Sequence, residues 1–307
     1  MAKDGDILLG LLGQSLGHSL SPVIHQAFFD ELGLSGRYDK IEVADAEQVP
    51  ATLEDLAAGG YSGINVTIPY KLTVLPQLAA LDESATLAGA ANTIKFAEQP
   101  TGYNTDTSGL AEALSRLGLL AANAVSPASK VVVLGCGGAA RAAIIAVSTL
   151  GFKKLVVLAR NEDKARTMLD QLQGSAQRQS LIDNCAGARL VNFEALAHIS
   201  KSQSFGDDLF ADTALVINAT PVGQKDDLVP DLLIQFFAAI AEAEPSFVDL
   251  VYSKTETPLC KAAREAGFAQ VEDGKEMLIN QARLAFKIWT GQLPDGELAR
   301  TRLIERA

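Results

Sequence analysis

Residues Lys130 to Lys164 read KVVVLGCGGAARAAIIAVSTLGFKKLVVLARNEDK: an apolar strand, a glycine turn, an alanine-rich helix and a second apolar strand. The first strand lacks the alternation of apolar and polar residues that marks a half-exposed strand, which favours the buried centre of a parallel sheet. A strand, a helix and a strand in this order form one βαβ unit. The sequence therefore predicts an α/β fold with a doubly wound, parallel sheet in this region.

The glycine turn fits the pattern G-x-G-x-x-G/A, with Gly135 and Gly137 in the first two positions and Ala140 in the last. The first glycine permits a tight turn, the second lets the backbone approach a pyrophosphate, and the small last residue lets the helix pack closely on the strand. Free N–H groups at the start of the following helix favour an anion. Such a turn is weak evidence by itself, but within a βαβ unit it predicts a Rossmann-type dinucleotide site.

The residues after the second strand indicate which dinucleotide is bound. An NAD site usually carries Asp or Glu there, roughly 20 residues past the glycines, to bind the ribose 2′-hydroxyl. This chain has Ala159, Arg160 and Asn161, with Lys164 four residues beyond Arg160 and expected on the same helix face. A guanidinium that binds the 2′-phosphate gives roughly a ten- to hundredfold preference for NADP. The alternative is that Arg160 and Lys164 are ordinary surface cations.

Composition limits the other possibilities. A length of 307 residues suits two domains, and a net charge of −11 argues against a nucleic acid partner. No apolar run is long enough to cross a membrane, and the N-terminus does not have the form of a signal peptide, so we expect a cytoplasmic protein. Three distant cysteines and three histidines give no support to a disulfide framework or a metal centre.

Two serines precede the first predicted helix, in the segment GHSLSP from Gly17 to Pro22. Pro22 suits the first turn of a helix, so Ser21 could simply be its N-cap. Ser19 is less easily explained by capping. The two hydroxyls beside a helix N-terminus could instead hold a small carboxylate, and both roles can coexist.

A predicted strand over residues 63–69 ends at a proline and leads to Lys71. A lone lysine is usually a solvent-exposed residue. A second polar cluster follows, however, from Asn92-Thr93 to the segment GYNTD, whose Asp106 opens a predicted helix over residues 107–117. Asp106 could also serve only as the N-cap of that helix. A third polar and glycine-containing segment, NATPVG from Asn218 to Gly223, ends a buried strand, which is where an open α/β sheet binds ligands.

Together these segments resemble the shikimate dehydrogenase family, which includes quinate dehydrogenases. The similarity spans nearly the whole chain and follows the family's order. It is carried by GHSLSP (17–22), INVTIPYK (64–71), LAGAANTI (87–94), GYNTD (102–106), GCGGAARA (135–142), NATPVG (218–223), DLVYS (249–253) and MLINQA (277–282).

The resemblance implies reversible reduction of 3-dehydroshikimate to shikimate by NADPH, in aromatic amino acid biosynthesis. It implies Lys71 and Asp106 as the catalytic pair. The substrate would be bound by Ser19, Ser21, Thr67, Asn92, Tyr252 and Gln281. The cofactor would be bound by Gly135, Gly137, Gly138, Ala139, Arg160, Asn161, Lys164, Thr220 and Gly274. Glu83 matches an acidic position whose role stays open, and no metal is implied.

The residue types suit this chemistry. Hydride transfer to a carbonyl carbon leaves an alkoxide, which needs a proton donor within about 3 Å. A lysine ammonium can hydrogen-bond that oxygen, stabilise its growing charge and supply the proton. A carboxylate partner holds the ammonium in place. The sequence alone does not decide whether this charge or desolvation of the lysine has the larger effect.

The chain departs from the family pattern at Ser253-Lys254 and Lys275-Glu276, both expected near the nicotinamide, and the polar excursion over 173–187 is long. A quinate/shikimate dehydrogenase using NAD or NADP is the nearest alternative, although two serines favour shikimate. An aminoshikimate-type dehydrogenase is a further one. A non-catalytic NADP-binding regulatory module is the remote alternative, and a tetrahydrofolate dehydrogenase does not suit the motifs.

The predicted architecture has two domains. Residues 1–120 form an α/β substrate-binding and catalytic domain, completed by C-terminal helices over 270–307, and residues 121–269 form an NADP-binding Rossmann domain. The segment LLAANAVSPAS, residues 119–129, is the predicted linker. We expect a small-molecule substrate, no nucleic acid or membrane partner, and a monomer or a homodimer.

Overall fold

The computed structural model describes residues 6–118, 129–173, 189–192, 209–223, 228–253 and 255–305. Two compact units are present, one formed by Met1–Gly109 with Leu278–Ala307 and the other by Leu110–Met277. Residues 119–128 of the predicted linker and residues 174–187 of the predicted excursion lie outside the described part. Among the described helices, none is long and apolar enough to cross a membrane.

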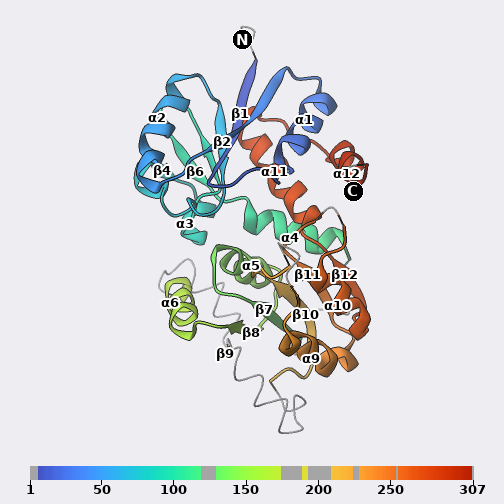
Figure 1. Cartoon of the computed structure of the whole chain (residues 1–307). Coiled ribbons are helices and arrows are strands. Elements are labelled where there is room, and N and C mark those ends of the chain that lie inside the picture. The colour runs from blue at the N-terminus through green and yellow to red at the C-terminus, as the bar shows by residue number, and fades with distance from the viewer. Residues whose placement is uncertain are drawn as a thin grey trace. The chain divides into compact units, whose positions relative to one another are not determined.

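The first unit contains a mixed, six-stranded sheet with the order β2-β1-β3-β5-β6-β4 (Figure 1). The pairs β1/β2, β1/β3 and β4/β6 are parallel, whereas β5 runs antiparallel to β3 and to β6. The strands are β1 (Ile7–Gly13), β2 (Gly36–Glu42), β3 (Gly63–Val66), β4 (Ala80–Leu81), β5 (Thr93–Lys95) and β6 (Thr101–Tyr103).

The C-terminal helices belong to the first unit's core. A buried cluster joins Leu9 and Phe28 from the start of the chain with Phe286, Trp289 and Leu303 from its end. The Trp289 indole N–H also donates to the Ile94 carbonyl at 2.9 Å. The helices of this unit are α1 (Ser21–Leu32), α2 (Val49–Ala58), α3 (Glu83–Ala88), α4 (Asp106–Arg116), α11 (Lys275–Thr290) and α12 (Glu297–Ile304), of which α4 and α11 run across the unit boundaries in the chain.

The second unit contains an all-parallel, six-stranded sheet with the order β9-β8-β7-β10-β11-β12. When the strands of this unit are numbered along the chain, the order in the sheet is 3-2-1-4-5-6, which is the Rossmann order. The topological switch lies between β7 and β10. The strands are β7 (Lys130–Leu134), β8 (Lys154–Ala159), β9 (Arg189–Asn192), β10 (Thr213–Asn218), β11 (Ser246–Asp249) and β12 (Gln270–Glu272).

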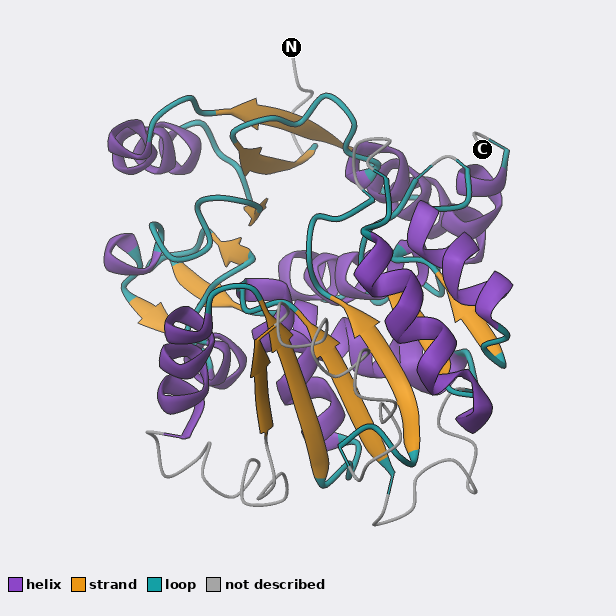
Figure 2. Cartoon of the chain, turned by 60° about the horizontal axis from the view of Figure 1, so that its bottom comes forward, coloured by secondary structure: helices purple, strands orange, loops and turns teal. Residues whose placement is uncertain are grey.

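Helices pack around this parallel sheet (Figure 2). Val132 and Leu134 of β7 contribute to a buried cluster with Phe236 and Phe237, and Leu259 joins the same cluster. Four of the five β7 residues are buried, the exception being Lys130. This is expected for a strand that is covered on both faces. The helices are α5 (Gly138–Thr149), α6 (Glu162–Gln173), α9 (Asp231–Ile240) and α10 (Pro258–Ala266).

The fold class predicted from the sequence is confirmed, including the return of the C-terminal helices to the first unit. One local prediction was wrong, and one of the alternatives is excluded. The strand expected over residues 63–69 ends at Val66, because a run of turns follows from Ile68 onward and includes the cis Ile68–Pro69 bond. Helix α1 has Leu20, not Ser21, at its N-cap position, so Ser21 is already the first helical residue.

Candidate active site

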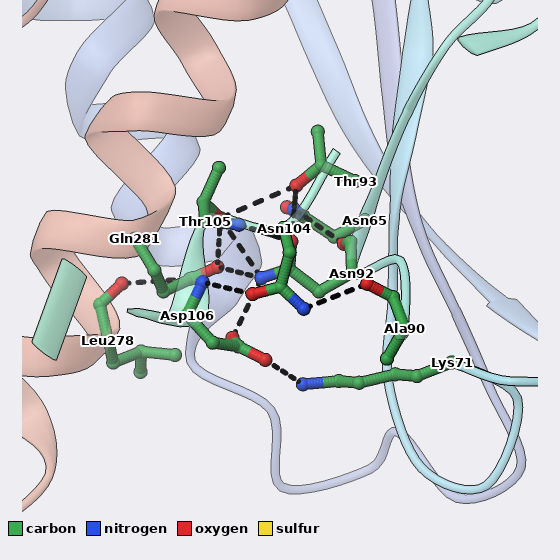
Figure 3. A network of polar contacts seen from close by, with 10 residues as sticks. All are labelled: Asn65, Lys71, Ala90, Asn92, Thr93, Asn104, Thr105, Asp106, Leu278 and Gln281. Carbon is green, nitrogen blue, oxygen red and sulfur yellow. Dashed lines mark hydrogen bonds and ion pairs between the residues drawn. The ribbon is translucent and has the colours of Figure 1, made fainter. Parts of the chain in front are cut away.

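The first unit brings Lys71 and Asp106 together. Lys71 lies in the turns that follow β3, and Asp106 is the first residue of α4. The Lys71 ammonium donates to Asp106 Oδ2 at 2.5 Å, while the lysine side chain keeps 26 % of its surface exposed and Asp106 keeps 12 % (Figure 3). The ammonium is thus held by a carboxylate without being closed off from solvent, which leaves N–H groups for another acceptor.

Asn92 holds the second oxygen of the same carboxylate. Its Nδ2 donates to Asp106 Oδ1 at 2.7 Å, and its Oδ1 accepts from the Thr105 backbone N–H at 2.8 Å (Figure 3). The backbone of the residue before Asn92 also donates to the Lys71 carbonyl at 3.0 Å. Both members of the Lys71–Asp106 pair are therefore tied to the segment that carries Asn92.

Gln281 reaches this network from α11. A Cβ on Gly109 would lie 2.6 Å from the Gln281 backbone nitrogen, so only glycine lets α4 and α11 approach this closely. Gln281 is buried, its Nε2 donates to the Leu278 carbonyl at 2.9 Å, and its Oε1 accepts from Thr105 Oγ1 at 3.4 Å. The helix that returns to the first unit thereby places Gln281 beside Asn92.

The predicted carboxylate-binding serines lie within one turn at the start of α1. The Ser19 hydroxyl accepts from the Ser21 backbone N–H at 3.3 Å, so Ser19 stabilises the turn before α1 without being its N-cap. Ser19 is half-buried and Ser21 is buried. Thr67 is also half-buried, and its methyl group occupies the space that a Cβ on Gly13 would need.

In the second unit, the glycine turn joins β7 to α5. Gly135 has φ of 111°, in the region that favours glycine, and a Cβ there would lie 2.9 Å from the Ala219 carbonyl oxygen. Gly137 is the N-cap of α5, without a side-chain cap, and Cβ atoms on Gly137 and Gly138 would meet nothing within 4 Å. These residues and Ala139 are exposed. The free helix N–H groups and the open approach fit a dinucleotide pyrophosphate.

Thr220 lies beside that turn, at the end of β10, the strand on the other side of the topological switch. A Cβ on Gly135 would lie 3.1 Å from Thr220 Cγ2. The Thr220 hydroxyl donates to Asn218 Oδ1 at 2.6 Å, and Asn218 Nδ2 in turn donates to Asp249 Oδ1 at 2.7 Å. Burial raises the pKa of Asp249 to about 6, although hydrogen bonds from Thr257 and Asn218 oppose the shift. This network fixes the carboxyl ends of β10 and β11.

Gly274 and Tyr252 belong to the same unit. The Gly274 N–H donates to the Val251 carbonyl at 3.0 Å, and a Cβ on Gly274 would lie 2.5 Å from the Leu250 carbonyl oxygen. Only glycine fits at this position, because any side chain would collide with the backbone after β11. Tyr252 is half-exposed, three residues past the end of β11.

Arg160 follows β8 directly and is exposed, and helix α6 starts two residues later. Arg160 therefore does not share a helix with Lys164, which corrects the sequence prediction. Asn161 Oδ1 accepts from the Lys164 backbone N–H at 2.8 Å and so caps α6. Ala159 is buried, and no acid directly follows β8, so the position where NAD sites carry a carboxylate holds a cation instead.

The described residues contain no group of three or more His, Cys, Asp and Glu side chains arranged to hold a metal ion. The set of site residues predicted from the sequence does not include the buried residues behind the Lys71–Asp106 pair. Asn65, Thr93 and Thr105 are all buried and hydrogen-bonded around Asn92. The polar dipeptide Asn92-Thr93 and the run Asn104-Thr105 carried the available signal, since consecutive polar residues in buried segments need partners.

Comparison with known proteins identifies two segments. Residues 11–94 match the model of the shikimate dehydrogenase substrate-binding domain, and residues 274–303 match that of the shikimate 5'-dehydrogenase C-terminal domain. A curated relative, shikimate dehydrogenase (NADP(+)) of Citrifermentans bemidjiense, is 36 % identical over 93 % of this chain and 90 % of its own.

Solved structures agree over the whole length. Shikimate 5-dehydrogenase from Thermus thermophilus in complex with NADP(H) and shikimate has a TM-score of 0.74 and 28 % identity, covering 98 % of this chain and 100 % of that one. Quinate dehydrogenase from Corynebacterium glutamicum in complex with NAD has a TM-score of 0.77 and 30 % identity, covering 98 % of each chain.

A Rossmann-type unit and a second α/β unit that carries a lysine–aspartate pair define a two-domain, dinucleotide-dependent oxidoreductase. The particular family follows from the sequence identity to curated relatives, which extends over nearly the whole chain. The chain belongs to the shikimate dehydrogenase family.

Proposed function

We propose that this chain is an NADP-dependent shikimate dehydrogenase, which interconverts 3-dehydroshikimate and shikimate in aromatic amino acid biosynthesis. The observation that carries the proposal is the Lys71–Asp106 contact of 2.5 Å, present in a member of this family. The Lys71 ammonium hydrogen-bonds the carbonyl oxygen of the substrate and gives it a proton as the alkoxide forms. Asp106 keeps the ammonium in place and balances its charge.

NADPH supplies the hydride to the carbonyl carbon when it is bound. Gly137, Gly138 and Ala139 offer the free N–H groups of α5 to its pyrophosphate, because no side chain caps that helix. Arg160 binds the 2′-phosphate, supported by Lys164. Thr220 and Gly274 complete the cofactor site in this proposal, and Asn161 contributes by holding the start of α6.

The substrate carboxylate is bound by the hydroxyls of Ser19 and Ser21. The Ser19 oxygen accepts a hydrogen bond within the turn, and its O–H remains available to donate to a carboxylate. Thr67, Asn92, Gln281 and Tyr252 are proposed to bind the ring hydroxyls or cover the substrate. The cytoplasmic location and the monomeric or homodimeric state stay predictions.

Quinate oxidation with NAD is the second candidate, and the similarity to the Corynebacterium glutamicum enzyme favours considering it. Quinate lacks the ring double bond and has one more hydroxyl, so it presents a bulkier, non-planar carbon to the serines. The two serines support shikimate, and the absence of an acid directly after β8 supports NADP.

Initial rates with shikimate and with quinate, each with NADP and with NAD, test the proposal. We expect shikimate with NADP to give the highest kcat/KM of the four pairs. Faster turnover of quinate with NAD would replace both assignments. Absence of turnover with all four pairs, together with measurable NADP binding, would support the non-catalytic module.

A further inference from the structure

The hydroxyl of Thr93 lies between two asparagine side chains behind the Lys71–Asp106 pair. Thr93 is fully buried at the start of β5. Its Oγ1 accepts from Asn65 Nδ2 at 3.0 Å and donates to Asn92 Oδ1 at 2.9 Å (Figure 3). This hydroxyl touches neither Lys71 nor Asp106.

The direction of these hydrogen bonds is fixed at Asn92. The Thr105 backbone N–H is a donor only, and it lies 2.8 Å from Asn92 Oδ1, which identifies that atom as the amide oxygen. The opposite end of the amide must then be the NH₂ group, and it lies 2.7 Å from Asp106 Oδ1. A rotation of this amide would turn an oxygen toward a carboxylate, which is repulsive.

The direction is also fixed one step further back. The Asn92 backbone carbonyl only accepts hydrogen bonds, and it lies beside Asn65 Nδ2, which identifies that atom as the NH₂ group. The Tyr38 hydroxyl, on the other side of the amide, therefore donates to Asn65 Oδ1 at 2.7 Å. That NH₂ group donates both to Thr93 Oγ1 and to the Asn92 backbone carbonyl at 3.2 Å. The Thr93 hydroxyl has one proton to donate, and Asn92 Oδ1 at 2.9 Å is a nearer acceptor than Thr105 Oγ1 at 3.4 Å.

We propose that Thr93, held by Asn65, which Tyr38 holds in turn, is a positioning residue. Together with the Thr105 backbone N–H, it keeps the Asn92 amide turned with its NH₂ group toward Asp106. It thereby orients the carboxylate that holds Lys71. This inference rests on the proposed function for its kinetic consequence, because Asp106 matters for turnover only if it works with Lys71. Its structural consequence, the position of the Asn92 amide, is independent of any activity.

Thr93→Val is the direct test, because valine keeps the shape and removes the hydroxyl. One hydrogen bond of ordinary strength corresponds to a loss of about two- to tenfold in kcat/KM for shikimate. The KM for NADP should stay unchanged, and Thr93→Ser should restore most of the rate. Thr213→Val is the matched control, since Thr213 is equally buried on β10 and donates to the Phe210 carbonyl.

A double-mutant cycle with Asn92→Ala separates positioning from general destabilisation. If Thr93 acts through Asn92, Thr93→Val has no further effect on kcat/KM in the Asn92→Ala background. Equal effects in both backgrounds would overturn the proposal. If Thr93→Val does not fold, Tyr38→Phe serves in its place, with a smaller loss and the same dependence on Asn92.

A crystal structure of Thr93→Val keeps the two proposals distinguishable. We expect the Asn92 side chain to shift so that its contact with Asp106 Oδ1 becomes longer than the 2.7 Å of the wild type. An unchanged contact would refute the positioning role, whatever the kinetics show. A wild-type enzyme without turnover of shikimate, but with a displaced Asn92 in the variant, would refute the proposed function alone.

Discussion

Lys71 Nζ and Asp106 Oδ2 lie 2.5 Å apart, although 35 residues of chain separate them. Neither residue lies within a strand. Lys71 belongs to the turns after β3, and Asp106 is the first residue of α4. The two residues therefore meet just outside the sheet, although strands of the sheet bring their segments together. Asn92, next to β5, hydrogen-bonds the other oxygen of the carboxylate.

Replacement of Lys71 by alanine should remove most of the activity. We expect kcat for shikimate to fall about 10²- to 10⁴-fold, the usual contribution of a general acid or base, with KM for shikimate little changed. Steady-state kinetics measure both values. Lys154→Ala, at an exposed lysine of β8, is the control and should behave as wild type. A Lys71→Ala enzyme that keeps more than about a tenth of kcat would exclude Lys71 from the chemistry.

Arg160→Gln should alter the choice between the two cofactors. Without the guanidinium, the ratio of kcat/KM with NADP to kcat/KM with NAD should fall roughly ten- to a hundredfold. Arg166→Gln is the control, because Arg166 is an exposed arginine of α6 that pairs with Glu162. If both variants keep the wild-type ratio, the 2′-phosphate is recognised elsewhere.

The two glycines of the turn should respond differently to alanine. At Gly137, with φ of −95° and no atom within 4 Å of a Cβ, alanine should leave the melting temperature unchanged. Its methyl group would instead hinder the pyrophosphate and raise the KM for NADP about tenfold, equivalent to one hydrogen bond to a charged group.

At Gly135, φ of 111° and the nearby Ala219 carbonyl should make alanine destabilise the fold by about 1–3 kcal/mol. Thermal melts and cofactor titrations of both variants measure the contrast. A Gly137→Ala protein that binds NADP as tightly as wild type would show that the pyrophosphate does not approach this turn.

His25 should make the first unit sensitive to acid. Burial lowers the pKa of His25 to about 3, with the Asn65 side chain opposing the shift, and neither ring nitrogen has a hydrogen bond of good geometry to the described residues. Below pH 6.5 the unfolded chain therefore binds a proton that the folded chain does not, and stability falls as pH falls from 6.5 toward 3. At pH 5 the loss from this group is about 2 kcal/mol.

His25→Phe should remove that loss. Phenylalanine suits a site where the imidazole stacks on Tyr38 at 4.1 Å and meets Phe28 edge-on. The difference in unfolding free energy between pH 7 and pH 5 should shrink by about 2 kcal/mol. Urea titrations followed by the fluorescence of the single tryptophan, Trp289, report on this unit. The exposed His18→Gln variant is the control, and an unchanged pH dependence in His25→Phe would contradict the assignment.

Much of the architecture was predictable because it depends on short-range patterns. The apolar run before Gly135 and the spacing of the glycines predicted β7, the turn and α5, and Pro258 and Gly267 mark the start and the end of α10. The strand after Gly63 was predicted too long, since apolar Ile68 is compatible with a strand but is 76 % exposed in the turns. The hydrophobic pattern alone does not distinguish an apolar strand residue from an apolar residue in an exposed turn.

The candidate site was predictable as a set of residues but not as an arrangement. Lys71, Asp106 and Asn92 were chosen by resemblance, and their assigned roles stay predictions. Nothing in the spacing indicated that Thr93 and Asn65 stand behind Asn92. Such contacts join strands that are neighbours only after the sheet has formed, with β5 placed antiparallel to β3.

The amino-acid sequence by itself determined the local elements, the glycine turn and the cation at the end of β8, because these follow from φ preferences, burial patterns and charge along a continuous segment. Only the tertiary structure decided how α11 returns past Gly109, which oxygen of Asp106 faces Lys71, and which way the Asn92 amide is turned. The physical reason is that hydrogen-bond direction depends on partners from distant segments, which packing alone brings within reach.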